Sequence, residues 1–192
     1  MRAVSSPLSE KDARSMALGE IISINGPVVT GRDEVHIRAL QYLDEGKSVP
    51  SCLKGAILYH CGPIMKKLDS GRFSVVAAGP TTSARMNDLE PRFIREFGIR
   101  AIIGKGGMSR EVADAMKEVG CVYLAATGGA AVSYAEGLNI VTGCEWEDLG
   151  MAEALWKFDA SRLGPLVVAI DAEGNSLYDR VAEKVRANLD RA

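Results

Sequence analysis

Four apolar runs that do not alternate with polar residues most constrain how this chain can fold. They lie at residues 75–78, 101–103, 122–126 and 166–170. Continuous apolar runs are typical of strands that are covered on both faces, whereas strands with one face in water alternate. Such a sheet needs helices packed against it. The runs therefore predict an α/β fold, in a single layered domain with a mostly parallel or mixed central sheet.

Amphipathic segments supply the expected helices. Residues 109–119 and 177–189 each carry apolar residues at helical spacing. Ser109 is suited to begin the first of these helices as its N-cap, and Gly120 is suited to end it.

The N-terminal third of the domain carries shorter signals. Residues 19–24 and 27–29 favour strands, and the Asn-Gly pair between them is typical of a hairpin turn. Thr30 is placed to cap a following helix, and residues 56–59 favour a short strand. Residues 1–16 are mostly polar. We expect them to form a flexible N-terminal arm, with the folded domain at residues 17–192.

Composition and charge exclude several classes of protein. The chain has 192 residues and a net charge of −2, so it lacks the basic excess that binds nucleic acid or a membrane surface. No run approaches the ~20 apolar residues of a membrane-spanning helix. The first residues lack the apolar region of a signal peptide. We expect a cytoplasmic protein.

The four cysteines do not indicate a metal site in this chain. Cys52, Cys61, Cys121 and Cys144 form no Cys-x-x-Cys motif, which makes a zinc ribbon or a self-contained iron–sulfur cluster a poor fit. Buried, reduced thiols are the simpler interpretation.

Three polar clusters follow predicted strands, at residues 30–33, 79–85 and 104–107. In open α/β sheets, ligands bind beyond the carboxyl ends of the strands. Two of these clusters are also placed to begin helices, whose N-termini favour anions. Taken alone, each cluster is also explained by a turn, a helix cap and a solvated charge. Together they favour an anion site.

The side chains of the clusters agree with an anion as ligand. Arg32, Arg85 and Lys105 supply three cations, and arginine matches a carboxylate or phosphate with two hydrogen bonds. Thr81 and Arg85 share one face if a helix begins at the threonines. A small dianion such as a dicarboxylate suits this set.

Two other sites are rejected or less favoured. The stretch from Gly98 to Gly106 differs from a phosphate-binding P-loop, because five residues separate its glycines and Gly106 stands where Ser or Thr must meet magnesium. His36 and His60 are the only histidines. Hydrogen-bonded structural roles are favoured over catalytic roles for both.

Five stretches carry a family resemblance. They are GRDEVH at residues 31–36, GAILYHCGP at 55–63, AAGPTTSARM at 77–86, IIGKGGM at 102–108 and EDLGMAEALW at 147–156. Together they resemble the β subunit, or C-terminal domain, of the class I iron–sulfur fumarate hydratases and the related L-tartrate dehydratases. AAGPTTSARM followed by GKGGM is the specific part. The resemblance implies a swivelling β/α domain that closes over an α domain.

The resemblance also implies a cofactor and a partner. In this family, the α domain holds a 4Fe–4S cluster on three cysteines. This chain has no sign of that domain, so it resembles half an enzyme whose α subunit is a separate chain. Two α and two β subunits are the stoichiometry that the family suggests, and we expect the isolated chain to self-associate through its partner-binding face.

Site roles follow from the same resemblance. Thr81 corresponds to the base that removes the C3 proton of malate. By the same resemblance, four residues correspond to those that bind the substrate carboxylates: Arg32, Thr82, Arg85 and Lys105.

Several functions stay open from the sequence. A fumarate hydratase is favoured over an L-tartrate dehydratase, and methylated fumarates are further substrates to consider. A phosphohistidine carrier would need an accessible reactive histidine. A non-catalytic dicarboxylate-binding module would bind its ligand without an iron-bearing partner.

Overall fold

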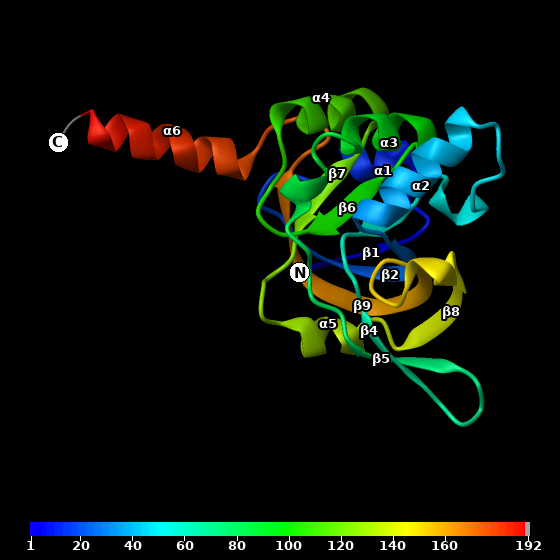
Figure 1. The fold of residues 1–192 in the computed structure, drawn as a ribbon. Helices are drawn as coiled ribbons and strands as arrows, with labels where there is room; N and C mark the ends of the chain where they lie inside the picture. The colour runs from blue at the N-terminus through cyan, green and yellow to red at the C-terminus, as the bar shows by residue number, and fades with distance from the viewer. Residues whose placement is uncertain (191–192) are drawn as a thin grey trace.

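A seven-stranded sheet forms the centre of the protein. The computed structural model of the chain describes residues 1–190. The sheet has the order β1-β2-β3-β6-β7-β9-β8 and crosses the middle of the molecule (Figure 1). Its strands are β1 (Arg2–Ser5), β2 (Ile21–Thr30), β3 (Ile57–Tyr59), β6 (Ala101–Gly104), β7 (Val122–Ala125), β8 (Ile140–Glu145) and β9 (Leu155–Ile170).

A pairing between β2 and β9 closes this sheet on itself. Strands β1, β2, β3, β6 and β7 pair in parallel, in that order. Strand β9 is antiparallel to β2, β7 and β8. Its 16 residues reach from β7 to β2, with Ile170 opposite Tyr123 and Val167 opposite Ile21. The predicted α/β class, with a mixed and mostly parallel sheet, is confirmed.

Helices cover the outside of the closed sheet. They are α1 (Glu10–Arg14), α2 (Asp33–Asp44), α3 (Glu90–Phe97), α4 (Arg110–Val119), α5 (Ala131–Glu136) and α6 (Leu177–Leu189), with short 3₁₀ turns η1 (Ser51–Leu53), η2 (Ser83–Met86) and η3 (Glu147–Leu149). Helices α2, α3 and α4 lie together along one side, and α5 lies on the opposite side (Figure 1). No helix of the described chain, residues 1–190, has the length and apolar character needed to cross a membrane.

Two apolar clusters hold these layers together. One fills the space under α2, α3 and α4, where Val35, Phe93 and Met116 meet Leu58 and Ile102 of the sheet. The other lies on the opposite side of the strands and includes Ile22, Tyr59 and Leu124. Alternate residues of the same strands enter the two clusters, as the period of a strand requires. The predicted coverage of both faces is therefore confirmed for β6 and β7, and β3 is covered in the same way.

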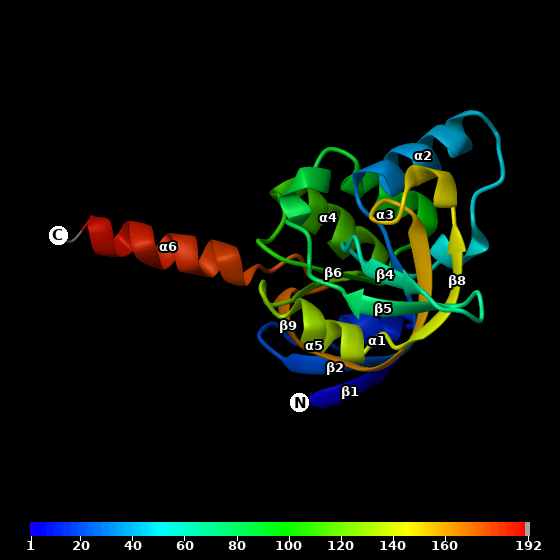
Figure 2. The same ribbon diagram turned by 60° about the horizontal axis from the view of Figure 1, so that its bottom comes forward.

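Both predicted helices at the C-terminal side of the chain are present. Helix α4 begins after Ser109 and ends at Gly120, whose φ of 72° is left-handed. Helix α6 projects away from the rest of the molecule (Figure 2). Its Val181, Val185 and Leu189 are therefore 60%, 52% and 71% exposed.

The N-terminal segment differs from the flexible arm expected at residues 1–16. Strand β1 pairs in parallel with β2, and helix α1 follows with a capping box at Ser9. Val4, Leu8 and Met16 are buried in the core. Polar residues surround these apolar residues in the sequence, so average composition conceals how much apolar surface the segment buries.

The Asn-Gly pair does not form the expected hairpin. Residues 21–30 form one strand, β2, which pairs with β1 on one side and β9 on the other. Gly26 has a φ of 92°, and a Cβ there would lie 2.5 Å from the carbonyl oxygen of Ser6. Thr30 does not cap α2, because its hydroxyl accepts a hydrogen bond from the backbone N–H of Trp156. Pairing with distant strands overrides the local turn and cap signals here.

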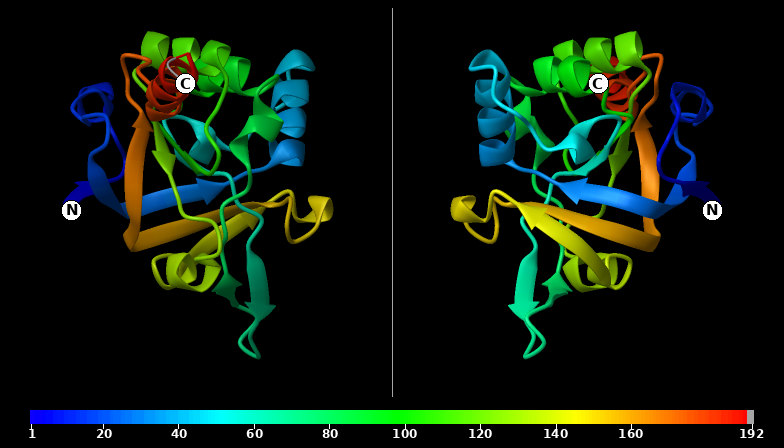
Figure 3. Two further views of the ribbon diagram at one scale, coloured as in Figure 1. Left: turned by 90° about the vertical axis from the view of Figure 1, so that its left-hand side faces the viewer. Right: turned by 90° about the vertical axis from the view of Figure 1, so that its right-hand side faces the viewer.

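One of the four apolar runs also lies outside the central sheet. Residues 75–78 fall mostly in β5 (Phe73–Ala77), which pairs with β4 (Ile64–Lys67) in a separate two-stranded ribbon. This ribbon extends from one end of the molecule (Figure 3). Val76 is 49% exposed, so this run is not covered on both faces.

Leu8 tests whether the N-terminal segment is part of the folded unit. We expect Leu8→Ala to lower the free energy of unfolding by about 2–5 kcal/mol, because it leaves a cavity in the core. The matched control, Leu189→Ala in the exposed part of α6, should change it by less than about 0.5 kcal/mol. Urea unfolding followed by circular dichroism measures both. Equal free energies of unfolding for the two variants would instead support a flexible arm at residues 1–16.

Candidate active site

Three loops meet at the carboxyl ends of adjacent parallel strands. The arginine loop (residues 30–33) follows β2, and the lysine loop (residues 104–107) follows β6. Strand β3 lies between these two strands. The threonine loop (residues 79–83) reaches the same edge of the sheet from β5. The three polar clusters of the sequence therefore come together, as ligand sites of α/β sheets do.

Backbone hydrogen bonds place the threonine loop between β3 and β6. The Thr81 N–H donates to the carbonyl of His60, just beyond β3, over 2.7 Å. The Lys105 N–H donates to the Thr81 carbonyl over 3.3 Å, and the Ser83 N–H donates to the Lys105 carbonyl over 3.0 Å. Thr82 and Lys105 thus form a short parallel bridge. Thr81, Thr82 and Lys105 are held side by side by the backbone.

Arg32 lies in a space that a glycine provides. Its guanidinium forms an ion pair of 3.0 Å with Glu153 and is about one-fifth exposed. A Cβ on Gly62 would lie 2.7 Å from Arg32 Nη1 and 2.6 Å from the Ala152 carbonyl oxygen. Within residues 1–190, the buried Nε of Arg32 has no hydrogen-bond acceptor. The guanidinium is therefore not fully satisfied by the groups of the described chain.

Arg85 is more exposed and has an acidic neighbour. Its guanidinium lies 2.9 Å from a carboxylate oxygen of Asp33, at the start of α2, and its side chain is 51% exposed. An exposed pair of this kind is held weakly. Among the described residues, Lys105 forms no ion pair. Glu153 and Asp33 thus neutralise part of the charge of the two arginines.

The sequence suggested an α-helix that begins at the threonines, but the structure of residues 1–190 has no α-helix there. Thr82 precedes the 3₁₀ turn η2, and α3 begins later, at Glu90. Thr81 and Arg85 therefore do not share a helical face. The α2 helix does begin in the arginine loop, with Arg32 at its N-cap position and no side-chain cap.

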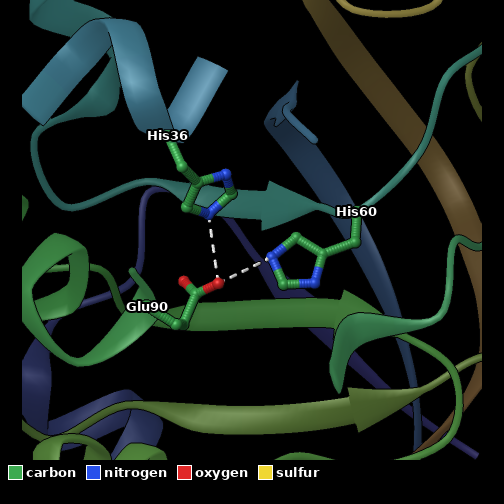
Figure 4. A group of neighbouring side chains, drawn as sticks. All are labelled: His36, His60 and Glu90. Carbon is green, nitrogen blue, oxygen red and sulfur yellow. Dashed lines mark hydrogen bonds and ion pairs between the residues drawn. The ribbon is translucent and has the colours of Figure 1, made fainter. Parts of the chain in front are cut away.

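A buried network lies directly beneath these loops and comprises His36, Glu90, His60 and Ser83. His36 Nε2 lies 3.1 Å from a carboxylate oxygen of Glu90 and is hydrogen-bonded to it (Figure 4). His60 Nε2 lies 3.1 Å from the same oxygen, an ion-pair distance, although its angle is not that of a hydrogen bond. All four side chains are fully buried.

Ser83, the last residue of the threonine loop, connects the network to that loop. His60 Nδ1 is 2.9 Å from Ser83 Oγ, and the Tyr123 hydroxyl donates to the same oxygen over 3.0 Å. Gly104 makes room for it, because a Cβ there would lie only 1.9 Å from Ser83 Oγ.

The partners of His36 indicate its protonation state. His36 Nδ1 lies 2.7 Å from the Arg32 carbonyl oxygen, which only accepts, so this nitrogen carries a proton. Burial alone would lower the pKa of His36, but the charge and hydrogen bond of Glu90, the Arg32 carbonyl and the charge of Asp33 together outweigh burial and raise it. Burial would raise the pKa of Glu90, but the two imidazoles outweigh it and lower it. For His60, burial prevails and lowers the pKa. These directions favour a state with an ionised Glu90, a charged His36 and a neutral His60.

Structural roles predicted for both histidines agree with this burial. A phosphohistidine carrier needs a histidine that a phosphoryl donor can reach, and neither side chain is exposed. Sequence reasoning did not single out Glu90. Its position 54 residues after His36 and 30 after His60 gave no local signal.

The cysteines do not fit an iron–sulfur cluster. Within the part of the chain that the structure describes, no three of them lie together; the one group of potential metal ligands comprises His36, His60 and Glu90. Burial raises the pKa of the Cys61 and Cys144 thiols to about 12. Cluster ligands are thiolates, so these side chains are poorly suited to that role.

A cavity of about 280 Å³ lies elsewhere, against β2 and the start of β3. None of the five predicted site residues lines it. The candidate site is instead the open surface where the three loops meet.

The Glu90–His36 pair makes stability depend on pH. A raised pKa means that the contribution of His36 to the free energy of unfolding is complete below its unfolded pKa of about 6.5 and is lost as pH rises through the raised value. His60 has a lowered pKa and titrates on the acid side of this range. We expect wild type to be more stable than Glu90→Gln near neutral pH, with a gap that narrows at alkaline pH. Urea unfolding across this range measures the gap.

Glu96→Gln, an exposed change on the same helix, serves as the control. It should keep the alkaline loss of stability seen in wild type. A gap between wild type and Glu90→Gln that stays constant with pH would contradict the ionised pair.

Comparison with known proteins places this architecture in a family. A family model described as "Fumarase C-terminus" matches residues 3–181. A Methanocaldococcus jannaschii protein, provisionally named L(+)-tartrate dehydratase subunit beta, is 42% identical over 184 residues, which cover 95% of this chain and 94% of that protein. The L(+)-tartrate dehydratase subunit beta of Escherichia coli strain K12 is 32% identical over 190 residues, covering 99% and 91%.

A longer relative contains the same unit. A Geobacillus stearothermophilus protein, provisionally named fumarate hydratase class I, is 40% identical over 185 residues. These cover 96% of this chain but 35% of that protein, so the chain spans about a third of its length. The match from β1 into α6, together with the relatives that align along nearly the whole chain, shows that this protein belongs to the fumarase C-terminus family.

Proposed function

We propose that this chain is the β subunit of a two-subunit hydro-lyase that interconverts fumarate and L-malate. The convergence of Arg32, Thr81 and Lys105 at the carboxyl ends of β2, β3 and β6 carries the proposal. Relatives named as subunits beta support the dependence on an α subunit. The α2β2 assembly and a cytoplasmic location remain part of the proposal.

Carboxylate binding is the main task of this chain. In the free chain, Glu153 and Asp33 lie against Arg32 and Arg85. A dicarboxylate would replace these acidic neighbours and also reach Lys105. Arginine binds a carboxylate with two parallel hydrogen bonds. The partial exposure of the Arg32 side chain supports this exchange, because a ligand can approach its guanidinium from solvent.

Proton transfer is assigned to Thr81. Conversion of malate to fumarate removes the C3 proton and expels the C2 hydroxyl, which leaves as water. A threonine hydroxyl is a weak base unless its surroundings activate it. Lys105 and the arginines supply positive charge nearby, which favours the deprotonated oxygen. Thr82, bridged to Lys105, is placed to donate a hydrogen bond to a substrate carboxylate.

The 4Fe–4S cluster that the family implies is assigned to the α subunit. The cysteines described above do not fit it. The open surface formed by the three loops is then the face that closes against the α subunit, as a swivelling domain would.

L-tartrate is the second candidate substrate. Two relatives that align along more than nine-tenths of their length are named as tartrate dehydratase subunits. Tartrate and malate are both 2-hydroxydicarboxylates, so the same cations would bind either. Methylated fumarates present the same two carboxylates. A non-catalytic dicarboxylate-binding module would use this site without an α subunit.

Turnover with the α subunit tests the proposal. We expect this chain, mixed anaerobically with its cluster-loaded α subunit, to hydrate fumarate, and either chain alone to be inactive. The ratio of kcat/KM for fumarate and L-tartrate decides the substrate. If neither substrate turns over while the cluster is intact, the hydro-lyase proposal fails. Binding of a dicarboxylate by this chain alone would then favour the binding module.

Thr81→Val tests the proposed base. It keeps the side-chain shape and removes the hydroxyl, so we expect kcat to fall by about 10²–10⁴-fold, the usual contribution of a general acid or base. Thr142→Val, an exposed change in β8, is the matched control and should keep wild-type kcat. Wild-type kcat in Thr81→Val would assign the proton transfer to another group.

A further inference from the structure

We propose that the buried network is a positioning device, which holds the arginine loop and the threonine loop in a fixed relation to each other. The inference rests on the proposed function, because it concerns the same loops. Its members do not touch the surface, so they are positioning residues and not catalytic ones.

One arm of the network ends at the arginine loop. His36 lies on the first turns of α2, and its Nδ1–H donates to the Arg32 carbonyl. The backbone N–H of His36 donates to the same carbonyl over 3.2 Å. Two donors from one residue therefore hold the peptide that carries the Arg32 guanidinium.

The other arm ends at the threonine loop. The backbone carbonyl of His60 accepts from the Thr81 N–H, while its ring nitrogen meets Ser83 Oγ. His60 thus holds this loop at two points on either side of Thr82. Ser83 in turn donates its backbone N–H to Lys105, so the lysine loop is tied to the same arm.

Glu90 joins the two arms at one oxygen. It lies at the start of α3, 3.1 Å from a ring nitrogen of each histidine. Asp33 and Cys121 are other titratable groups that act electrostatically on the cluster. A buried carboxylate is costly unless cations or donors compensate it. His36 supplies that compensation through its hydrogen bond, and His60 packs its Nε2 against the same oxygen without a hydrogen bond. A shift of His36 would leave the carboxylate uncompensated, and close packing at Glu90 links the arm of His36 to that of His60.

A metal ion is the competing explanation for three converging ligands. Structural zinc sites close with four protein ligands, whereas catalytic zinc sites use three and leave a fourth position open to water. Within residues 1–190 the cluster offers three ligands, and all three side chains are fully buried, away from water. Instead, His36 Nδ1 already donates to the Arg32 carbonyl and its Nε2 is hydrogen-bonded to Glu90. His60 Nδ1 lies 2.9 Å from Ser83 Oγ, while His60 Nε2 and the second oxygen of Glu90 have no hydrogen-bond partner within residues 1–190.

Ser83→Ala provides the test, because it cuts one arm and removes a single oxygen. A displacement of about 1 Å in a catalytic group can cost about 10²-fold in rate. We expect kcat/KM of the complex with the α subunit to fall by about that factor. In the full chain alone, we expect the amide NMR resonances of Thr81, Thr82 and Lys105 to shift. Glu90→Gln should move the same resonances and those of the arginine loop.

Leu138→Ala separates positioning from stability. It removes a fully buried side chain from the apolar cluster that includes Ile22 and Leu124. It should therefore lower the free energy of unfolding while leaving kcat/KM and these amide resonances near wild type. Unshifted resonances in Ser83→Ala would overturn the inference. Stoichiometric zinc in the purified chain, lost in His60→Gln, would also overturn it in favour of a metal site. If the wild-type complex turns over neither substrate, the proposed function fails, and the amide shifts still decide the positioning role.

Discussion

Parallel pairing of β2, β3 and β6 determines where every candidate site residue lies. Because these strands run the same way, their carboxyl ends share one edge of the sheet, and the loops that follow them must meet there. Arg32 and Lys105 lie at that edge directly. The threonine loop comes from a separate ribbon and joins it through backbone hydrogen bonds to His60 and Lys105. The chemistry of the site depends on this shared edge more than on any single helix.

Because the cationic loops meet at one edge of the sheet, acidic side chains of the same chain must compensate their charge. Bringing cationic loops together costs free energy unless anions accompany them. Glu153 and Asp33 supply those anions at the surface, and Glu90 does so in the interior. The two levels differ in solvent access. Surface carboxylates can exchange with a ligand, whereas the interior carboxylate has no route to water and stays with its histidines.

Much of the fold and part of the site could be predicted from the sequence. Runs such as residues 101–103 lack polar alternation, and burial on both faces is the simple physical cause. The same argument failed for residues 75–78, because a short ribbon can also carry apolar residues. Asn25 and Gly26 give a true local turn signal, yet two flanking strands override it. Glu90 was beyond prediction, since a carboxylate is normally exposed and its histidine partners are far away in the sequence.

Closure of the sheet has a consequence for how the chain folds during synthesis. Ile21 pairs with Val167, so β2 must wait for a partner that is synthesised much later in the chain. Contacts between residues so far apart in sequence slow folding, because the entropy of closing the loop is lost before the contact forms. Until β9 emerges, one edge of β2 has no neighbour and is open to pairing with other chains. Correct closure of the sheet therefore depends on how quickly β9 reaches that edge once it has been synthesised.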